Sequence, residues 1–549
     1  MCDFKSIVDI FRSRLVPRRR TMPTLKLDQI SISEILQGLK NGHFSSEGLV
    51  RTYIKRIEQV NSIVHVVSEV NHNAVEIARE KDEERSRGSA RGSLHGVPIL
   101  IKNLFFATDG LKTTFGCTGL LEAIPSIEAT TIIKLREQGA IILGIANGSQ
   151  WANNRCTPGW SAVGGQCLGI YFKDQHPKGS SSGSAVGTAL GLCAAALGSE
   201  TSGSVILPAQ RSAIVGIKPT VGMTSRYGIY LASDSQDTAG VLARSVKDAA
   251  LMLTVIAGED QKDPITILDP RDSISCRKPN KPPDFTRACK SRKLDGVRIA
   301  IPRHILKNVD PTTIHLFTNA INTIKSLGAI IVDPASYSKF NPDRSSFTGD
   351  EYDLALRVDI YYNMKKSLSH FPTNPHSLYT LSDIISYTIA TPAEEASTRG
   401  YSFFESCLEA GKTYSPNSEE YKNSKNEREY MGKQIPKLLD KFECDMIVLP
   451  TCVAVEPADV GGNPVVSVPM GYYPAGTEIS RLNGMVDVGP GIPIGICFIG
   501  RRWDEEKLIA AAYAYEQATM WRERGKMVVK CDIELPSPIS GFGQKDEEI

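Results

Sequence analysis

A stretch of small residues, Lys178 to Ala209, constrains this 549-residue sequence more than any other part of it. Two clusters of small polar residues, Gly179–Ser184 and Ser199–Ser204, flank a segment of mostly apolar residues. Ser182 is placed to cap a helix, because its hydroxyl could accept from the free N–H groups of a first turn. The apolar residues then recur close to every 3.6 positions, which predicts a helix up to Gly198, a residue suited to ending it.

The second polar cluster has the layout of a nucleophile turn. A hydroxyl in a tight turn, beside a row of backbone N–H groups, is what an acyl-transfer nucleophile requires. Gly/Ser-rich composition is more often that of a flexible linker. A linker is not followed at once by a helix-patterned apolar segment and a second turn, so we favour the catalytic interpretation.

Residue by residue, this stretch resembles the amidase signature family. The family's G-S-S-[GS]-G cluster corresponds to Gly179–Gly183, and its G-S-[IV]-x-x-P-A turn corresponds to Gly203–Ala209. Gly216–Gly222 and Gln236–Gly240 also look like family segments. The closest-looking branch is the peptide-amidase-like one, in which GSSSGSA and a [TS]-E-T-x-G-S turn occur together. The resemblance extends roughly over residues 30 to 525.

The resemblance also implies the fold. Length alone would suggest two or three domains, because a single core stops growing near about 250–300 residues. The family instead implies an α/β fold, with one large α/β/α domain over residues 25–530 and a central mixed β-sheet flanked by helices. Residues 1–24 are then a disordered basic tail and residues 531–549 a C-terminal tail. A mitochondrial presequence is the alternative for the basic tail, although Asp3 and Asp9 oppose it, and Met22 could be the true start.

Leu94–Lys102 reads as a turn followed by a buried strand that ends at a lysine. Such a lysine most often extends its amine to the surface. If the amine is buried, desolvation lowers its pKa, and a neutral lysine can act as a general base. The family carries its catalytic lysine after a G-[VI]-P-x-x-[IVL]-K run, so the resemblance points to Lys102.

The resemblance implies a Ser–Ser–Lys catalytic triad whose bridging serine lies on a cis peptide bond. Matching the motifs assigns the nucleophile to Ser204, the bridging serine to Ser180 and the base to Lys102. A serine hydroxyl attacks only when a base takes its proton, and a bridging hydroxyl can relay that proton. Backbone N–H groups of the turn would meet the oxyanion, namely those of Thr201, Ser202, Gly203 and Ser204. This chemistry needs no metal ion and no organic cofactor.

Three further side chains are candidates for substrate binding. Trp151 ends an N-x-S-[EQ]-[FW] segment and Gln166 precedes the signature, and simple packing is an equal alternative for both. Ser181 is the third, at the centre of a formal G-x-S-x-G match. No apolar strand leads into that match, as a nucleophile elbow requires, so Ser181 is not assigned as a nucleophile. His95 is expected to be structural.

Three positions depart from the family pattern. Ser202 stands where Asp or Gly is usual, Asn103 stands where Asp typically follows the lysine, and Ile206 stands where many members have Arg. The first change bears on the rigidity of the turn, and the second on the hydrogen bonds and pKa of the lysine. The triad itself is intact.

Composition excludes several other classes of protein. Lys and Arg number 63 against 61 Asp and Glu, so a net charge of +2 gives no general attraction to nucleic acid. Twelve cysteines show no CxxC pair and no metal-ligand spacing, which favours a reducing compartment. No apolar run reaches ~18 residues, so no membrane span is expected. We therefore expect a cytoplasmic monomer or homodimer whose partner is a small-molecule amide.

Local patterns predict the other elements. Helices are expected near 31–39, 46–57, 130–136, 249–256, 311–327, 350–370 and 505–519, and strands near 140–144, 297–302, 445–450, 465–469 and 494–500. Lys81–Arg91 is expected to be an exposed loop, and Asp260–Lys293 a linker. Residues 377–433 are irregular in pattern. In the family this region covers the active-site mouth, so we expect it to set specificity.

Three functions are compatible with these residues. The favoured one is an amidohydrolase that cleaves a linear carboxamide, non-peptide or C-terminal, and releases ammonia or an amine, in amide catabolism or a specialised biosynthetic pathway. The second is a protein of the amidotransferase A-subunit type, which delivers ammonia to glutamyl-tRNA with a partner protein; the peptide-amidase-like turn argues against it. The third is an amidase fold that has lost activity through Ser202 and Asn103 and binds a ligand.

Overall fold

The computed structural model describes residues 26–269, 282–338 and 353–535, and its centre is an 11-stranded β-sheet. In chain order the strands of this sheet are β1 Val67–Val70, β2 Pro98–Lys102, β3 Ile141–Ala146, β6 Ala195–Glu200, β7 Val215–Lys218, β8 Thr238–Ala243, β9 Arg298–Pro302, β10 Ile330–Ala335, β11 Met446–Pro450, β12 Val465–Tyr472 and β15 Pro493–Ile499. Two small hairpins stand apart, β4 Trp160–Ser161 with β5 Gly165–Gln166, and β13 Ser480–Leu482 with β14 Met485–Val488.

The order across the sheet is β1-β3-β2-β6-β8-β7-β12-β15-β11-β9-β10. β2 is parallel to β3 and β6, and β9 is parallel to β10 and β11. β8, β7, β12 and β15 each run antiparallel to both of their neighbours. The sheet is therefore mixed, and the predicted fold class is confirmed.

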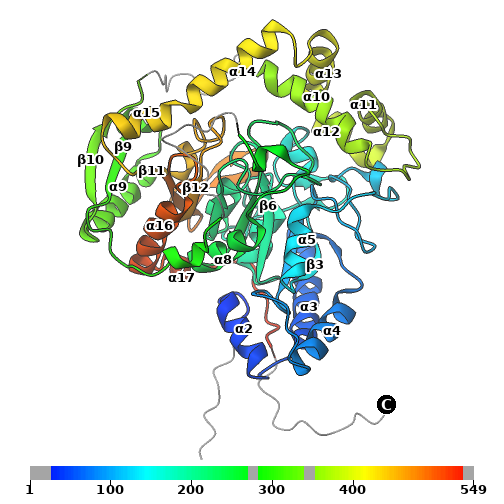
Figure 1. Ribbon diagram of the computed structural model, residues 1–549, viewed down its shortest axis with the longest axis horizontal. Helices are drawn as coiled ribbons and strands as arrows, with labels where there is room; N and C mark the ends of the chain where they lie inside the picture. The colour runs from blue at the N-terminus through cyan, green and yellow to red at the C-terminus, as the bar shows by residue number, and fades with distance from the viewer. Residues whose placement is uncertain (1–25, 270–281, 339–352, 536–549) are drawn as a thin grey trace, which may run out of the picture.

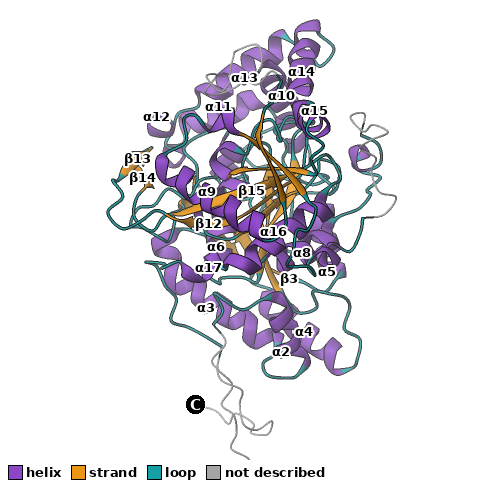
Figure 2. Ribbon diagram, turned by 90° about the vertical axis from the view of Figure 1, so that its left-hand side faces the viewer, coloured by secondary structure: helices purple, strands orange, loops and turns teal. Residues whose placement is uncertain are grey.

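Helices surround the sheet (Figure 2). They are α2 Ile32–Lys40, α3 Ser46–Val64, α4 Ala74–Ser86, α5 Thr130–Glu137, α6 Ser182–Ala189, α7 Ile206–Arg211, α8 Val246–Ile256, α9 Pro311–Ser326, α10 Leu354–Leu368, α11 Leu381–Ala390, α12 Ala396–Arg399, α13 Ser402–Thr413, α14 Glu419–Gly432, α15 Gln434–Lys441, α16 Glu505–Thr519 and α17 Trp521–Arg524. α2–α4 lie at one end of the molecule and α10–α14 at the other (Figure 1). Within the described ranges, no helix combines the length and apolar character that a membrane crossing requires.

The helix predicted through Gly198 is wrong in its second half. α6 ends at Ala189, and residues 195–200 form the central strand β6 instead. Gly191 has a φ of +64°, and a Cβ there would approach the Leu27 carbonyl oxygen to 2.4 Å, so the chain turns sharply at this point. The small residues that follow are buried between β2 and β8. A short apolar run fits a buried strand as well as a buried helix, which is why periodicity misled the prediction.

The predicted cap at Ser182 is also wrong. Ser181 occupies the N-cap position and makes no side-chain capping bond there. The Ser182 hydroxyl instead donates back to the Lys178 carbonyl at 2.5 Å. By contrast, the capping box predicted at Ser31 and Glu34 is present at the start of α2.

Two regions predicted to be irregular are helical. α4 reaches Ser86, and Lys81, expected in an exposed loop, is buried and paired with Glu84 at 3.0 Å. Most of residues 377–433 forms α11–α14, and α14 in particular has few apolar residues because much of its surface faces solvent. α11 opens with a capping box, Thr380 with Asp383, whose sequence spacing the prediction overlooked.

A second apolar core joins these helices to the loops near the triad candidates. It contains the aromatic side chains Phe106, Phe115, Trp151, Tyr230, Phe371 and Phe404. We call α10–α14 the cap: this core attaches α10, α11 and α13 to the loops that follow β2 and β3, and a further apolar cluster joins Tyr421 of α14 to α10 and α13. The cap is therefore placed over the ends of these strands.

The predicted tails and linker are only partly within the described residues. Residues 1–25 and 536–549 lie outside them, as do 270–281 of the predicted linker. Residues 531–535 are close to the domain: Arg56 donates to the Ile533 carbonyl, and Leu535 is buried. In the linker, Phe285 is buried and Asp263 pairs with Arg226 at 2.8 Å.

Candidate active site

Lys102 is the last residue of β2, and its side chain is completely buried. The amine donates to the Ser180 hydroxyl at 2.7 Å, and lies 3.0 Å from the Ser199 carbonyl and 3.1 Å from the Ser199 hydroxyl. Burial lowers the pKa of Lys102 from 10.5 to about 7, although the carboxylates of Asp237 and Glu200 oppose this shift. A neutral lysine near pH 7 is a competent proton acceptor.

Ser180 and Ser204 are brought together by the backbone around them. The Gly179–Ser180 peptide bond is cis. The Ser180 carbonyl accepts from the Ser149 N–H at 2.9 Å, and the next N–H, of Ser181, donates to the Ser204 carbonyl at 3.1 Å. Both serines are buried. The structure thus gathers Lys102, Ser180 and Ser204, three residues from separate parts of the sequence, at one edge of the sheet.

The turn that carries Ser204 is held by Glu200, the last residue of β6. Its carboxylate accepts from the N–H groups of Gly203, Val205 and Ile206, at 3.0, 2.6 and 3.0 Å. Burial raises the pKa of Glu200, and the Lys218 ammonium and these N–H groups oppose the shift. One carboxylate therefore fixes the turn on both sides of the nucleophile candidate.

This arrangement corrects part of the predicted oxyanion hole. The Gly203 N–H is used by Glu200, so it does not face an incoming carbonyl. Among the described residues, the N–H groups of Thr201, Ser202 and Ser204 donate to no protein acceptor. Three of the four predicted donors are thus free to meet an oxyanion.

A small cavity adjoins Ser180. Its volume is about 10 Å³, close to that of one water molecule, and Ser180, Ser199, Thr201 and Asp237 are among its lining residues. Burial raises the pKa of Asp237 to about 6, and hydrogen bonds from Thr201 and from two backbone N–H groups oppose the shift. Ser202, which follows the lining residue Thr201, is exposed, so the site is open to solvent on the side of the turn.

The predicted substrate-binding side chains have mainly packing contacts. Trp151 is buried, and its ring centre lies 5.1 Å from that of Phe115 and 5.3 Å from that of Tyr230. The Gln166 amide donates to two backbone carbonyls, each at 3.0 Å. The Ser181 hydroxyl lies 3.2 Å from the Ser199 carbonyl and is buried. These contacts favour the packing alternative, because none of the three side chains is directed toward the turn by a hydrogen bond.

The positions that depart from the family have defined surroundings. The Asn103 amide donates to the Gly148 carbonyl at 3.0 Å and makes no hydrogen bond to the Lys102 amine. Ile206 is buried in α7. Ser202 lies beside the buried carboxyl of Asp459, and a hydrogen bond between their side chains opposes the burial that raises the pKa of Asp459.

Sequence reasoning missed Ser199, Glu200, Gln236, Asp237 and Asp459. The first two lie inside the signature stretch, and the next two lie in the segment Gln236–Gly240 that was used for the resemblance. Their polar character within buried segments was a usable signal, because a buried polar group needs a partner. Asp459 lies in a loop whose sequence is ordinary, so nothing there indicated a buried polar group.

Histidine and metal chemistry have no matching geometry among the described residues. His95 is buried, with Nε2 2.9 Å from the Lys81 carbonyl, as expected for a structural residue. In the described ranges no histidine is hydrogen-bonded to Ser180, Ser181 or Ser204. No group of three His, Cys, Asp or Glu side chains in these ranges could hold a metal ion.

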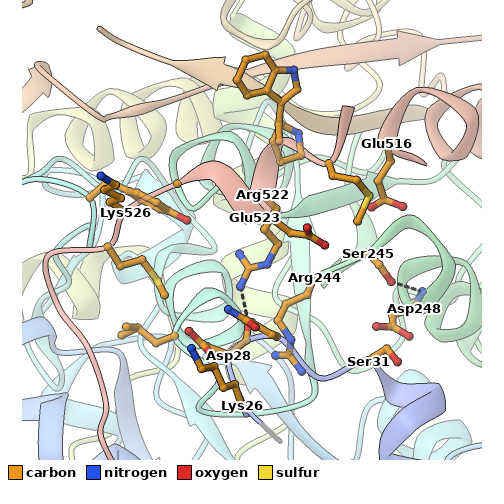
Figure 3. A pocket seen from close by; sticks show the side chains of 18 of the residues that line it. Lys26, Asp28, Ser31, Arg244, Ser245, Asp248, Glu516, Arg522, Glu523 and Lys526 are labelled. Atoms are coloured by element: carbon orange, nitrogen blue, oxygen red, sulfur yellow. Dashed lines mark hydrogen bonds between the residues drawn. The ribbon is translucent and has the colours of Figure 1, made fainter. Parts of the chain in front are cut away.

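A separate cavity of about 890 Å³ is lined mainly by residues from the two ends of the described chain, 26–31 and 516–534 (Figure 3). None of the triad candidates lines it. Two of its guanidinium groups bond main-chain acceptors: Arg522 donates to the Asp28 carbonyl at 2.8 Å, and Arg244 to the Ile30 carbonyl at 2.7 Å. The first of these contacts joins the two ends of the domain, so volume alone does not mark this cavity as the reaction site.

Comparison with known proteins gives one consistent result. The sequence matches the family described as Amidase over residues 48–509. A protein of Arthroderma benhamiae that carries an amidase name is 39% identical over 540 residues, covering 96% of this chain and 88% of that protein. The A subunit of the glutamyl-tRNA(Gln) amidotransferase of Bdellovibrio bacteriovorus is 29% identical, covering 91% and 99% of the two chains. The native peptide amidase structure from Stenotrophomonas maltophilia superimposes with a TM-score of 0.78 at 31% identity, covering 91% and 99%.

Proposed function

Because the chain belongs to the amidase signature family, whose members hydrolyse carbon–nitrogen bonds, we propose that it cleaves a linear carboxamide through an acyl-enzyme on Ser204. The observation that carries this proposal is the hydrogen bond of 2.7 Å from a buried lysine amine to the Ser180 hydroxyl. The pKa of about 7 leaves a large share of that amine neutral at physiological pH. A base of this kind is what a serine nucleophile lacks on its own.

The proposed reaction has two halves. The Ser204 oxygen attacks the amide carbon, and its proton passes through the Ser180 hydroxyl to the Lys102 amine. The open N–H groups of the turn stabilise the oxyanion, and Lys102 returns the proton to the leaving nitrogen as the carbon–nitrogen bond breaks. Water then attacks the acyl-enzyme by the same route and releases the carboxylic acid.

The substrate we propose is a primary carboxamide, so that ammonia is released. Structural similarity to a peptide amidase supports an amide at the end of a longer molecule, a C-terminal peptide amide among them. The site supports a small leaving group, because Ser180 and Ser204 are buried and the cavity beside Ser180 is only about 10 Å³. The acyl portion would then extend past the exposed Ser202 toward solvent.

The amidotransferase A-subunit type is the second candidate, since a protein of that type is 29% identical over nearly its whole length. Such a protein would hydrolyse glutamine only as part of an assembly. The isolated chain should therefore release little ammonia from glutamine and from other primary amides. An inactive amidase-fold binder would not react with a serine-directed reagent at all.

The test is intact-mass analysis after treatment with a fluorophosphonate, followed by an ammonia assay on a panel of primary amides. We expect one adduct on the wild type and none on Ser204→Ala, with much slower labelling of Lys102→Ala. Ser182→Ala is the matched control, because this serine belongs to the same cluster but bonds the Lys178 carbonyl. An unlabelled wild type, or equal labelling of Ser204→Ala, would reject the proposal.

A further inference from the structure

Resting on the proposed function, we propose that Arg428 of the cap is a positioning residue that holds the turn Thr201–Ser204 through Gln236. Arg428 lies on α14 and is buried. Gln236 precedes β8, and Asp459 lies in the loop before β12. The guanidinium therefore connects the cap to Gln236, which contacts Thr201, while Asp459 contacts the neighbouring Ser202.

The connection from Arg428 to Thr201 is a chain of two hydrogen bonds. An Arg428 Nη donates to the side-chain oxygen of Gln236. The same amide then donates, through its nitrogen, to the Thr201 carbonyl at 3.4 Å. Gln236 is buried, so water does not compete for either bond. Arg428 thus selects the side-chain orientation in which the Gln236 amide nitrogen faces the turn.

The Thr201 carbonyl matters because it shares a peptide unit with the Ser202 N–H. This unit is planar and trans, so its oxygen and its N–H point in opposite directions. Holding the oxygen toward Gln236 therefore fixes the Ser202 N–H toward the other side, where it is free to donate. This N–H is one of the three open donors of the turn.

The next residue of the turn, Ser202, has a contact of its own with Asp459. The Asp459 carboxyl accepts from the Val460 N–H at 2.8 Å and bonds the Ser202 hydroxyl. The Arg428 charge lowers the pKa of Asp459 against the effect of burial, which favours its ionised, accepting form. Two further carboxyl groups, of Asp353 at 3.7 Å and of Asp359, also face the guanidinium.

The cap has anchors that do not use Arg428. On α14, the Tyr421 hydroxyl donates to Asp359 at 2.7 Å, and the Ser424 hydroxyl accepts from an α10 N–H at 3.0 Å. At its end, a Cβ on Gly432 would approach the Gly461 Cα to 2.3 Å, so the two backbones are in direct contact. Since these contacts remain, replacing Arg428 should leave α14 docked and disturb mainly the turn.

The experiment compares Gln236→Glu, Arg428→Met and their combination. Gln236→Glu keeps an acceptor for Arg428 but removes the donor to the Thr201 carbonyl. We expect both single variants to label with fluorophosphonate about 10- to 100-fold more slowly at the high-pH plateau. The double variant should lose no more than the worse single variant, because both changes break one chain. With an amide substrate, kcat should fall and KM should change less than about threefold.

Lys422→Met is the matched control, since it removes a cation from an exposed position of the same helix. It should label at the wild-type rate. A merely structural role for Gln236 would leave Gln236→Glu as reactive as the wild type, and that result overturns the inference. So would additive losses in the double variant. An unlabelled wild type would instead reject the proposed function, so the two failures are distinguishable.

Discussion

The most direct consequence of the buried amine is a pH dependence set by Lys102. Its pKa falls from 10.5 to about 7, which corresponds to about 5 kcal/mol between the two protonation states. In the proposed mechanism, only the neutral amine can take the Ser204 proton. With a pKa of about 7, the neutral share rises about tenfold between pH 6 and pH 8 and then levels off. A lysine of ordinary pKa would instead give a rise of about a hundredfold with no plateau.

The assay is the second-order rate of fluorophosphonate labelling at Ser204, measured by intact mass from about pH 5.5 to about pH 10, a range that brackets the folded and ordinary pKa of a lysine. It needs no knowledge of the substrate. A rate that still climbs about tenfold per pH unit above pH 8 would refute the argument, and so would a flat profile from pH 6 to 8. As a second variant, Asp237→Asn removes a carboxylate that raises the pKa of Lys102, so the midpoint should move to lower pH. An unchanged midpoint would contradict that electrostatic role.

Three further variants test the site. Lys102→Met removes an amine whose pKa is 10.5 in the unfolded chain and about 7 in the folded one, so between these values only the unfolded state binds the proton. In urea titrations the free energy of unfolding of the wild type should therefore rise by about 4 kcal/mol relative to the variant from pH 7 to pH 10. Parallel plots of unfolding free energy against pH for the two proteins would contradict this. Glu200→Gln leaves one of three N–H groups without an acceptor, which should cost about 2 kcal/mol in urea unfolding and slow labelling at least about tenfold; wild-type labelling would refute the role of Glu200. Gly203 has a φ of +74°, and Gly203→Ala would place a Cβ 2.7 Å from the Leu207 side chain, so labelling should slow and the free energy of unfolding should fall by about 1–2 kcal/mol. Gly484→Ala is the control: Gly484 has a φ of +80° with open space around it, and this variant should keep full labelling.

The sequence predicted the sheet-forming segments well where apolar runs were bounded by turn residues. Pro98–Lys102 is a buried strand, and helix Glu505–Thr519 is found with the bounds expected. The central run after Ser182 was misread, because small residues satisfy helix and strand patterns equally. Only the pairing of Ala195–Glu200 with β2 and β8, a long-range contact, decides between them.

The candidate site was predictable to the extent that local motifs carry it. Lys102, Ser180 and Ser204 lie in recognisable segments, and the structure brings them together. The side chains that hold them were less visible. Arg428 and Asp459 lie more than 200 residues beyond the turn, and no local pattern ties them to it. The engagement of the Gly203 N–H by Glu200 also depends on a turn geometry that residue types alone do not specify.

The strand order has a consequence for synthesis on the ribosome. β7 is paired on one side by β8 but on the other by β12, which begins at Val465, long after β7 ends at Lys218. At about 5–20 residues per second, the nascent chain needs roughly 10–50 s to supply this neighbour. During that interval an apolar strand from the middle of the future sheet has an open edge, which is a template for pairing between chains. The yield of this protein should therefore depend on chaperones that shield the growing amino-terminal half.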